Sequence, residues 1–332
     1  MIHYIMTTTR DQEIATLEAE CNQRLQYFLR VKNYYVRYFQ RRMMSHHLKQ
    51  YYIRYVGQWY QQQCQQVEQY KQQQLQAIEE KYNRETKKYA LLVGINYENT
   101  NGELKGCIND VEKLKETLER RFQYHAQHIT TLLESQCTRN NILHEFSQLL
   151  QKAKAGDKVF FSFSGHGYSY HDYSRDEIDG KDELVITIDR KGIFDDEFKR
   201  IIMQHLKKDV TLVAIFDNCH SGTILDLPYQ YFKNQNGNES MIHHNKQSDT
   251  HGTVICLSGC RDDQVSIDAK FGEEYNGALS WTFVQLMKQE GNVTWKECVS
   301  QLREYLEKMR LQQVPQITCG TQMDLANAVV EI

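Results

Sequence analysis

The chain contains very little proline and, near its N-terminus, almost no glycine. Two of its 332 residues are proline, and from Arg10 to Lys88 there is no proline and one glycine, Gly57. Because these residues most often interrupt helices, their scarcity, together with apolar residues at helical spacing, predicts helical structure here. A single helix would be more than about 100 Å long. We therefore expect a hairpin of two helices with its break near Gly57.

Acidic residues are absent from much of the same region. Between Cys21 and Val67 there is no Asp or Glu, but there are eight basic residues: Arg24, Arg30, Lys32, Arg37, Arg41, Arg42, Lys49 and Arg54. Since the net charge is −3, the rest of the chain is distinctly acidic. Three interpretations are open: a helix packed on that acidic part, a contact with an anionic partner such as a nucleic acid or a membrane, or self-association.

Paired cysteines and long apolar runs are also missing. The nine cysteines are an odd number, and none form a C-x-x-C pair, which argues against a disulfide framework and a zinc ribbon. Residues 1–20 have no apolar core of signal-peptide type, and no stretch approaches the ~18 apolar residues that cross a membrane. We therefore expect a soluble, cytosolic protein whose cysteines are mostly buried and reduced.

Beyond residue 86, apolar strand-like segments alternate with amphipathic helical ones. The expected strands are 89–95, 128–133, 157–164, 183–189, 211–216, 254–258 and 314–318, and the expected helices are 107–122, 140–153, 194–206, 279–288 and 294–309. This alternation predicts an α/β sandwich with helices on both faces of a mainly parallel sheet. The polar segment 227–251 is expected to be an exposed loop.

Two expected strands end in residues suited to covalent catalysis. One is followed by Asp217-Asn218-Cys219 and the other by Gly165-His166-Gly167. Open parallel sheets bind ligands at the carboxyl ends of their strands. A cysteine becomes a nucleophile when a neighbouring group takes its proton or lowers its pKa. We therefore predict Cys219 as nucleophile and His166 as base and later acid; the alternative is a buried structural cysteine beside an incidental histidine.

Four motifs, in this order, resemble those of metacaspases, which are caspase-fold cysteine peptidases. They are Leu104-Lys-Gly-Cys-Ile-Asn-Asp110, Ser164-Gly-His-Gly167, Asp217-Asn-Cys-His-Ser-Gly222, and Ser258-Gly-Cys-Arg-Asp-Asp-Gln264 followed by Asp268-Ala269. The resemblance covers roughly residues 88–330 and does not extend to residues 1–85. It implies a caspase-like α/β/α sandwich with a mainly parallel central sheet, preceded by an N-terminal helical extension.

The resemblance also implies a division of the chain. Residues 1–85 would be a prodomain-like extension, basic and rich in glutamine and tyrosine. Residues 86–332 would be the catalytic domain, with a large part at 86–226, the exposed loop at 227–251 and a small part at 252–332. The short connection between the two catalytic parts resembles that of prodomain-bearing metacaspases. Caspases pair through a sheet edge whereas metacaspases resemble monomers, so the resemblance implies a monomer.

By resemblance, the backbone amides of Gly167 and Cys219 form the oxyanion hole. The substrate pocket receives Cys107, Asp110, Ser164 and Asp217. Two carboxylates at a pocket floor favour Arg or Lys, so the expected substrates are proteins or peptides cut after Arg or Lys, and not after Asp. Asp110 could instead be only a charge at a helix terminus.

A second set of carboxylates matches by motif those that bind an activating calcium ion in metacaspases. These are Asp182, Asp195, Asp196 and Asp226. Ca²⁺ takes roughly six to eight oxygen ligands, which four carboxylates and water can supply. The alternative is a solvated acidic surface. An EF-hand loop does not fit, because a glycine at its sixth position, Gly180, would put Arg175 at its first.

A peptidase directed to Arg or Lys would also cut its own exposed basic loops. The candidate sites are Arg84, Lys87 and Lys88 at the boundary of the extension, and Lys233 and Lys246 in the polar segment.

Two other functions remain open. One is a paracaspase-like, Arg-specific peptidase driven by dimerisation, against which the four calcium-type carboxylates argue. The other is a non-catalytic scaffold that acts through the N-terminal helices, against which the intact Cys219 and His166 argue.

Overall fold

The computed structural model describes residues 2–83, 85–171, 181–218, 224–233, 239–244, 248–259, 268–271, 274–289, 291–311 and 313–332. These fall into two compact units, Met1–Glu85 and Thr86–Ile332, which we treat separately. None of the helices in the described ranges is both long enough and apolar enough to cross a membrane.

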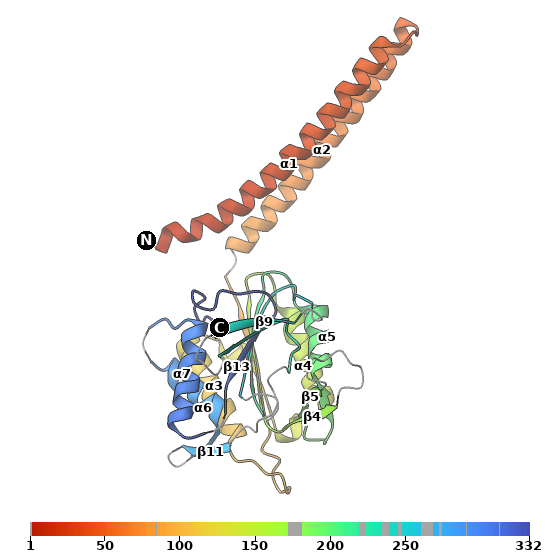
Figure 1. The fold of residues 1–332 in the computed structure, drawn as a ribbon. Helices are drawn as coiled ribbons and strands as arrows, with labels where there is room; N and C mark the ends of the chain where they lie inside the picture. Colours follow the sequence, from red (N-terminus) through yellow and green to blue (C-terminus); the bar gives the residue numbers. More distant parts are fainter. Residues whose placement is uncertain are drawn as a thin grey trace. The chain divides into compact units, whose positions relative to one another are not determined.

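The first unit is a hairpin of two long helices, α1 (Ile2–Arg41) and α2 (His46–Asn83) (Figure 1). The predicted break near Gly57 is wrong, because Gly57 lies inside α2 and the chain reverses at residues 42–45. A glycine inside a helix costs only about 1 kcal/mol relative to alanine, so Gly57 is tolerated. The residue that marks the beginning of α2 in the sequence is Ser45. Its hydroxyl accepts a hydrogen bond from the Leu48 amide at 3.4 Å and caps the helix.

An apolar seam holds the two helices together. Leu17, Cys21 and Val67 are buried in it. Nearer the turn, the ring of Phe39 stacks on that of Tyr52 with centroids 4.7 Å apart. The seam therefore uses one face of each helix and leaves the other faces to solvent.

The second unit is built on an eight-stranded sheet in the order β2-β1-β3-β7-β10-β13-β8-β9. The first five in this order run parallel: β2 (Ile129–Leu133), β1 (Lys88–Gly94), β3 (Lys158–Ser164), β7 (Thr211–Asp217) and β10 (Thr253–Ser258). The others are antiparallel: β13 (Gln316–Cys319), β8 (Tyr229–Lys233) and β9 (Glu239–His243). The central parallel strands are apolar runs buried on both faces.

Helices cover both faces of this sheet (Figure 1). On one face lie α4 (Arg139–Lys152) and α5 (Asp195–His205), and on the other lie α3 (Cys107–Phe122), α6 (Ala278–Met287) and α7 (Trp295–Lys308). The predicted α/β sandwich with a mainly parallel sheet is therefore confirmed.

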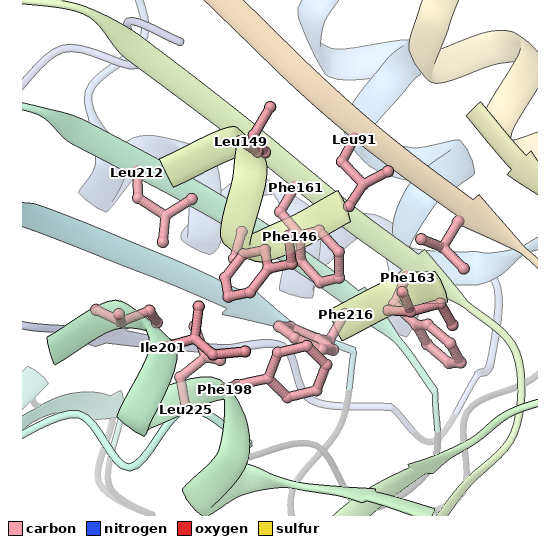
Figure 2. Packing of buried hydrophobic residues seen from close by; sticks show 14 of the residues in the cluster. Leu91, Phe146, Leu149, Phe161, Phe163, Phe198, Ile201, Leu212, Phe216 and Leu225 are labelled. Carbon is pink, nitrogen blue, oxygen red and sulfur yellow. The ribbon is translucent and has the colours of Figure 1, made fainter. Parts of the chain in front are cut away.

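Four phenylalanine rings contact one another in the core between the sheet and the α4–α5 face (Figure 2). Phe146 and Phe198 come from the helices, and Phe161 and Phe216 from β3 and β7. Their centroids are 4.9 to 5.8 Å apart in tilted or edge-to-face pairs, the geometry that aromatic quadrupoles favour. This packing fixes the two strands whose ends carry the predicted catalytic motifs.

The expectation of an exposed loop at 227–251 is wrong for its described residues. β8 and β9 pair with each other and add to the central sheet beside β13, and Leu227 and Tyr229 are buried. The short alternation Tyr229-Gln230-Tyr231 is a strand pattern. It is easily missed, because strands near a sheet edge carry polar residues.

Two smaller sheets complete this unit. One joins β4 (Gly167–His171), β5 (Lys181–Ile186) and β6 (Gly192–Phe194), and the other joins β11 (Asp268–Phe271) and β12 (Glu274–Gly277).

Candidate active site

The carboxyl ends of β3 and β7 lie side by side in register. Ser164, the last residue of β3, pairs with Asp217, the last residue of β7. His166 follows Ser164 by two positions, and Cys219 follows Asp217 by two. The two strand ends that lead to the predicted dyad are therefore neighbours in the sheet. Cys219 itself lies outside the described residues.

The His166 ring is held by two contacts from the segment between β1 and α3. Its Nε2 lies 2.6 Å from the carbonyl oxygen of Gly102, and its ring centroid lies 4.6 Å from that of Tyr97. The His166 amide donates to the Tyr97 hydroxyl at 2.9 Å, and this hydroxyl donates to the Ile186 carbonyl at 2.6 Å. Because a carbonyl can only accept, we assign the proton of the neutral imidazole to Nε2, which leaves Nδ1 as the basic nitrogen.

The sequence revealed no partner that orients His166, and the structure shows why. The partner is the backbone carbonyl of Gly102, and a carbonyl is present at every residue. A Cβ atom at position 102 would lie 3.2 Å from the imidazole Nε2, which favours glycine there. Tyr97 adopts a left-handed backbone with φ 54, uncommon for a tyrosine, and burial raises the pKa of its hydroxyl.

Replacing Tyr97 by phenylalanine is expected to lower kcat about tenfold or more while leaving KM nearly unchanged. The ring stays, but the hydroxyl that links the His166 amide to the Ile186 carbonyl is lost, and small displacements of a catalytic group are costly. Tyr124→Phe is the matched control, since the buried Tyr124 hydroxyl has no hydrogen-bond partner among the described residues. Steady-state kinetics and thermal unfolding measure both variants. An unchanged kcat in Tyr97→Phe would show that the Tyr97 hydroxyl does not position His166 for catalysis.

Two carboxylates converge on Gly277 at the beginning of α6. The Gly277 amide donates to both oxygens of Asp110, at 3.0 Å each. The Ser280 amide donates to Asp217 Oδ2 at 2.8 Å. A Cβ atom on residue 277 would overlap an oxygen of Asp217 and lie 2.7 Å from Asp110 Oδ2. Both carboxylates therefore approach the same α-carbon, and only glycine fits there.

Three of the four predicted pocket residues come together at this point. The Ser164 hydroxyl donates to Asp110 Oδ2 at 2.6 Å. Asp217 lies opposite Ser164 in the β3–β7 strand pair. Asp110, Ser164 and Asp217 are 1%, 3% and 4% exposed. The fourth, Cys107, is buried at the first position of α3, where its amide donates to Asn96 Oδ1 at 3.0 Å.

Gly277 and Ser280 were not identified from the sequence. Both act through backbone amides, which stabilise negative charge at a helix N-terminus whatever the side chain. Asp110 lies in the first turn of α3. It is therefore a charge at a helix terminus and also accepts hydrogen bonds at the beginning of α6.

Residues 88–228 match the protein-family model "Metacaspase, peptidase C14 domain". Metacaspase-1B of Neurospora crassa is 34% identical over 286 residues, which cover 71% of this chain and 67% of that protein. Metacaspase-1 of Pyricularia oryzae is 34% identical over 292 residues, covering 73% and 74% of the two chains. This chain belongs to the metacaspase family. The family makes it a cysteine endopeptidase, and the resemblance inferred from its motifs is confirmed.

A solved structure shares the fold of this chain at greater distance. The crystal structure of a Geobacter sulfurreducens protein superposes with a TM-score of 0.54 at 23% identity, covering 72% of this metacaspase and 96% of that chain.

Of the two residues predicted to form the oxyanion hole, the structure describes Gly167. Gly167 is the first residue of β4, where it pairs with Val185 of β5, and it follows His166 directly. Cys219, the other predicted donor, lies outside the described residues.

Three of the four predicted calcium ligands of this metacaspase have described side chains. Asp195 is buried at the first position of α5, where it accepts hydrogen bonds from the amides of Glu183 (2.6 Å) and Asp196 (2.8 Å). Asp196 is exposed. Asp226 is buried and has a left-handed backbone with φ 46. Asp182 lies in β5, but its side chain is outside the described part.

These carboxylates supply oxygen, the ligand type that Ca²⁺ takes. Among the described side chains, however, no three His, Cys, Asp or Glu residues form a group that could hold a metal ion. The described carboxylates alone therefore do not make a calcium site, and a site would need the Asp182 side chain or other oxygen ligands. Glu183, which the sequence analysis did not include, is fully buried next to Asp195 along β5 and α5.

The predicted self-cleavage sites differ in their surroundings. Lys87 is exposed, whereas Lys88 begins β1 and its ammonium donates to the carbonyls of Phe122 (2.7 Å) and Ile332 (3.1 Å). Lys233 ends β8, with its side chain outside the described part. Arg84 and Lys246 lie wholly outside it.

Proposed function

We propose that this metacaspase cleaves protein substrates after Arg or Lys, with Cys219 as the nucleophile and His166 as the base. The observation that carries the specificity is the convergence of Asp110 and Asp217 on Gly277. Two buried carboxylates at one place attract a cation, and a guanidinium offers donors in a fork that can engage both. An aspartyl side chain would instead be repelled by both charges.

The chemistry divides between the two strand ends. With Nε2 of His166 donating to Gly102, Nδ1 is the nitrogen that takes the thiol proton of Cys219. The thiolate attacks the substrate carbonyl, and the amides of Gly167 and Cys219 donate to the developing oxyanion. His166 then returns the proton to the leaving amine, and water hydrolyses the acyl-enzyme.

Replacing Gly277 by alanine is expected to lower kcat/KM for an arginyl peptide at least about 100-fold. The added methyl would overlap an oxygen of Asp217 and crowd Asp110, so it would displace the two carboxylates that are proposed to bind the substrate cation. Gly57→Ala is the matched control, because nothing lies within 4 Å of a Cβ at that position. Peptide kinetics and thermal unfolding separate a blocked pocket from a misfolded chain. A folded Gly277→Ala variant with normal kcat/KM would refute this pocket.

We further propose that Ca²⁺ activates the enzyme through Asp182, Asp195, Asp196 and Asp226. Bound calcium would neutralise these carboxylates and hold together the segments that carry them. Support comes from the burial of Asp195 and Asp226, because buried carboxylates in proteins are paired or coordinate metals. The Lys199 ammonium donates to the backbone carbonyl of Asp226 at 2.6 Å, so this backbone is already positioned.

Asp226→Asn is expected to raise the calcium concentration for half-maximal activity about tenfold or more. Asparagine tolerates the left-handed backbone at this position, so loss of charge is the main change. Activity is titrated with calcium, and binding is measured by calorimetry on the Cys219→Ala background. The exposed Asp11→Asn in α1 serves as the control. Full activity of the wild type in chelator would rule out this role for calcium.

Self-processing follows from the same specificity. We propose that this metacaspase cuts itself at basic residues next to the extension and in segment 227–251. The contacts of the Lys88 ammonium with two carbonyls favour its exposed neighbour Lys87 over Lys88, because a cleaved segment must become extended and accessible. Arg84, outside the described residues, stays a candidate from the sequence.

A further inference from the structure

Three tyrosines form an outward row on α1. Tyr27, Tyr34 and Tyr38 are 57%, 64% and 37% exposed. Spacings of seven and four residues place them within about 40° of one another around the helix. The hairpin seam uses other rings: Phe28 packs edge-on against Trp59 with centroids 5.8 Å apart. The tyrosine row is therefore not what holds the two helices together.

Exposed arginines accompany this row. Arg30, Arg37 and Arg41 are exposed and, by helical spacing, lie on one flank of the row. Just beyond the end of α1, the Arg42 guanidinium lies 5.0 Å from the ring centroid of Tyr38. We call the six residues Tyr27, Arg30, Tyr34, Arg37, Tyr38 and Arg41 the Tyr/Arg face.

The charge of this face is not balanced within its own stretch of the hairpin. There is no Asp or Glu between Cys21 and Val67. The same pattern continues on α2, where exposed Arg54 lies beside Tyr51 and Tyr55, which are 63% and 62% exposed. Exposed cations and aromatic rings thus occur on both helices.

We propose that the Tyr/Arg face binds single-stranded nucleic acid without strong sequence preference. Arginine neutralises phosphates and releases counterions, and exposed aromatic rings stack on bases of any identity. Tyr34 and Tyr38 already present nearly parallel rings, at 18° and with centroids 6.4 Å apart. The inference concerns the extension alone and does not depend on the proposed substrate specificity.

The side chains of the face favour this partner over two others. A membrane takes up apolar side chains such as Phe, Leu and Trp, but the described extension keeps Phe28, Phe39 and Trp59 in its seam. Apart from tyrosines, the exposed large hydrophobic side chains of the described extension are Met43 and Leu48, at the turn. Pairing with a second copy through the same face would set arginine against arginine, which is repulsive.

The test uses the full chain carrying Cys219→Ala and a fluorescein-labelled oligouridine of about 20 nucleotides, with the oligothymidine as a second probe. Fluorescence anisotropy is followed across a salt series. The variant Arg30→Gln/Arg37→Gln/Arg41→Gln is expected to flatten the slope of log K against log[salt] by about 2, at ~0.7 per phosphate contact. Tyr34→Ala/Tyr38→Ala is expected to weaken binding about tenfold or more, with the slope unchanged.

Three controls accompany these variants. Tyr34→Phe/Tyr38→Phe keeps the rings and should retain binding. Arg120→Gln/Tyr305→Ala removes an exposed arginine and an exposed tyrosine from the other unit and should also retain it. Circular dichroism verifies that α1 and α2 remain helical in every variant.

Several results would overturn the proposal. One is the absence of saturable binding to either probe at low salt. A second is an equal loss of binding in Arg120→Gln/Tyr305→Ala and in Tyr34→Ala/Tyr38→Ala. A third is full binding by Tyr34→Ala/Tyr38→Ala. Binding of the face to phosphatidylserine vesicles but not to the oligonucleotides would assign it to membranes, and loss of self-association alone would assign it to another copy.

Discussion

Cys219→Ala is expected to abolish peptide turnover and self-cleavage together, with kcat falling roughly 10⁴-fold or more. The substitution removes the thiol that is proposed to form the acyl-enzyme. Burial raises the pKa of Cys137, Cys298 and Cys319 to about 12, so these thiols stay protonated and unreactive at neutral pH. Peptide kinetics and a gel of the enzyme's own fragments measure the two activities.

Cys64→Ala is the matched control, because Cys64 is a partly exposed free thiol in α2. It should keep both activities. Residual self-cleavage in purified Cys219→Ala would mean that another protease makes the cuts or that Cys219 is not the nucleophile. A second check is thiol alkylation near pH 7, which should inactivate the wild type in step with modification of Cys219.

Asp217→Asn is expected to lower kcat/KM for an arginyl peptide by roughly 30- to 4,000-fold. This range corresponds to the about 2–5 kcal/mol lost when one partner of a buried charge pair is removed. The asparagine carbonyl can still accept from the Ser280 amide, so the beginning of α6 keeps its hydrogen bond. The measurement compares an arginyl peptide with a glutaminyl peptide that is otherwise the same.

The loss should be much larger for the arginyl peptide than for the neutral one. Exposed Asp249→Asn is the control for removing a negative charge elsewhere. Equal losses for both peptides would show that Asp217 only supports the fold, for instance by capping α6. Thermal unfolding of the variant distinguishes that outcome from general destabilisation.

The parts of the fold predicted well from sequence are those in which side-chain pattern and structure coincide. The helix expected at 107–122 is α3, Cys107–Phe122, because its apolar stripe is unambiguous. The buried strands β3 and β7 are likewise apolar runs that end in polar motifs. The pairing of Ser164 with Asp217 follows once those two strands are neighbours.

The parts that sequence reasoning missed depend on backbone groups or on weak patterns. The Gly102 carbonyl and the Gly277 and Ser280 amides carry no residue-type signal, although two of the three belong to glycines that a Cβ would crowd. The hairpin turn at residues 42–45 lacks both glycine and proline. The break was therefore predicted at Gly57, the one glycine of the region. The β8–β9 pair was hidden by its polar composition.

The central claim is that two carboxylates beside the catalytic strand ends select a basic residue. The most direct measurement is kcat/KM for three peptides that differ only in ending in Arg, Lys or Asp, each with and without millimolar calcium. We predict calcium-dependent cleavage of the arginyl and lysyl peptides, at least about 100-fold faster than of the aspartyl peptide. Faster cleavage of the aspartyl peptide would contradict the account.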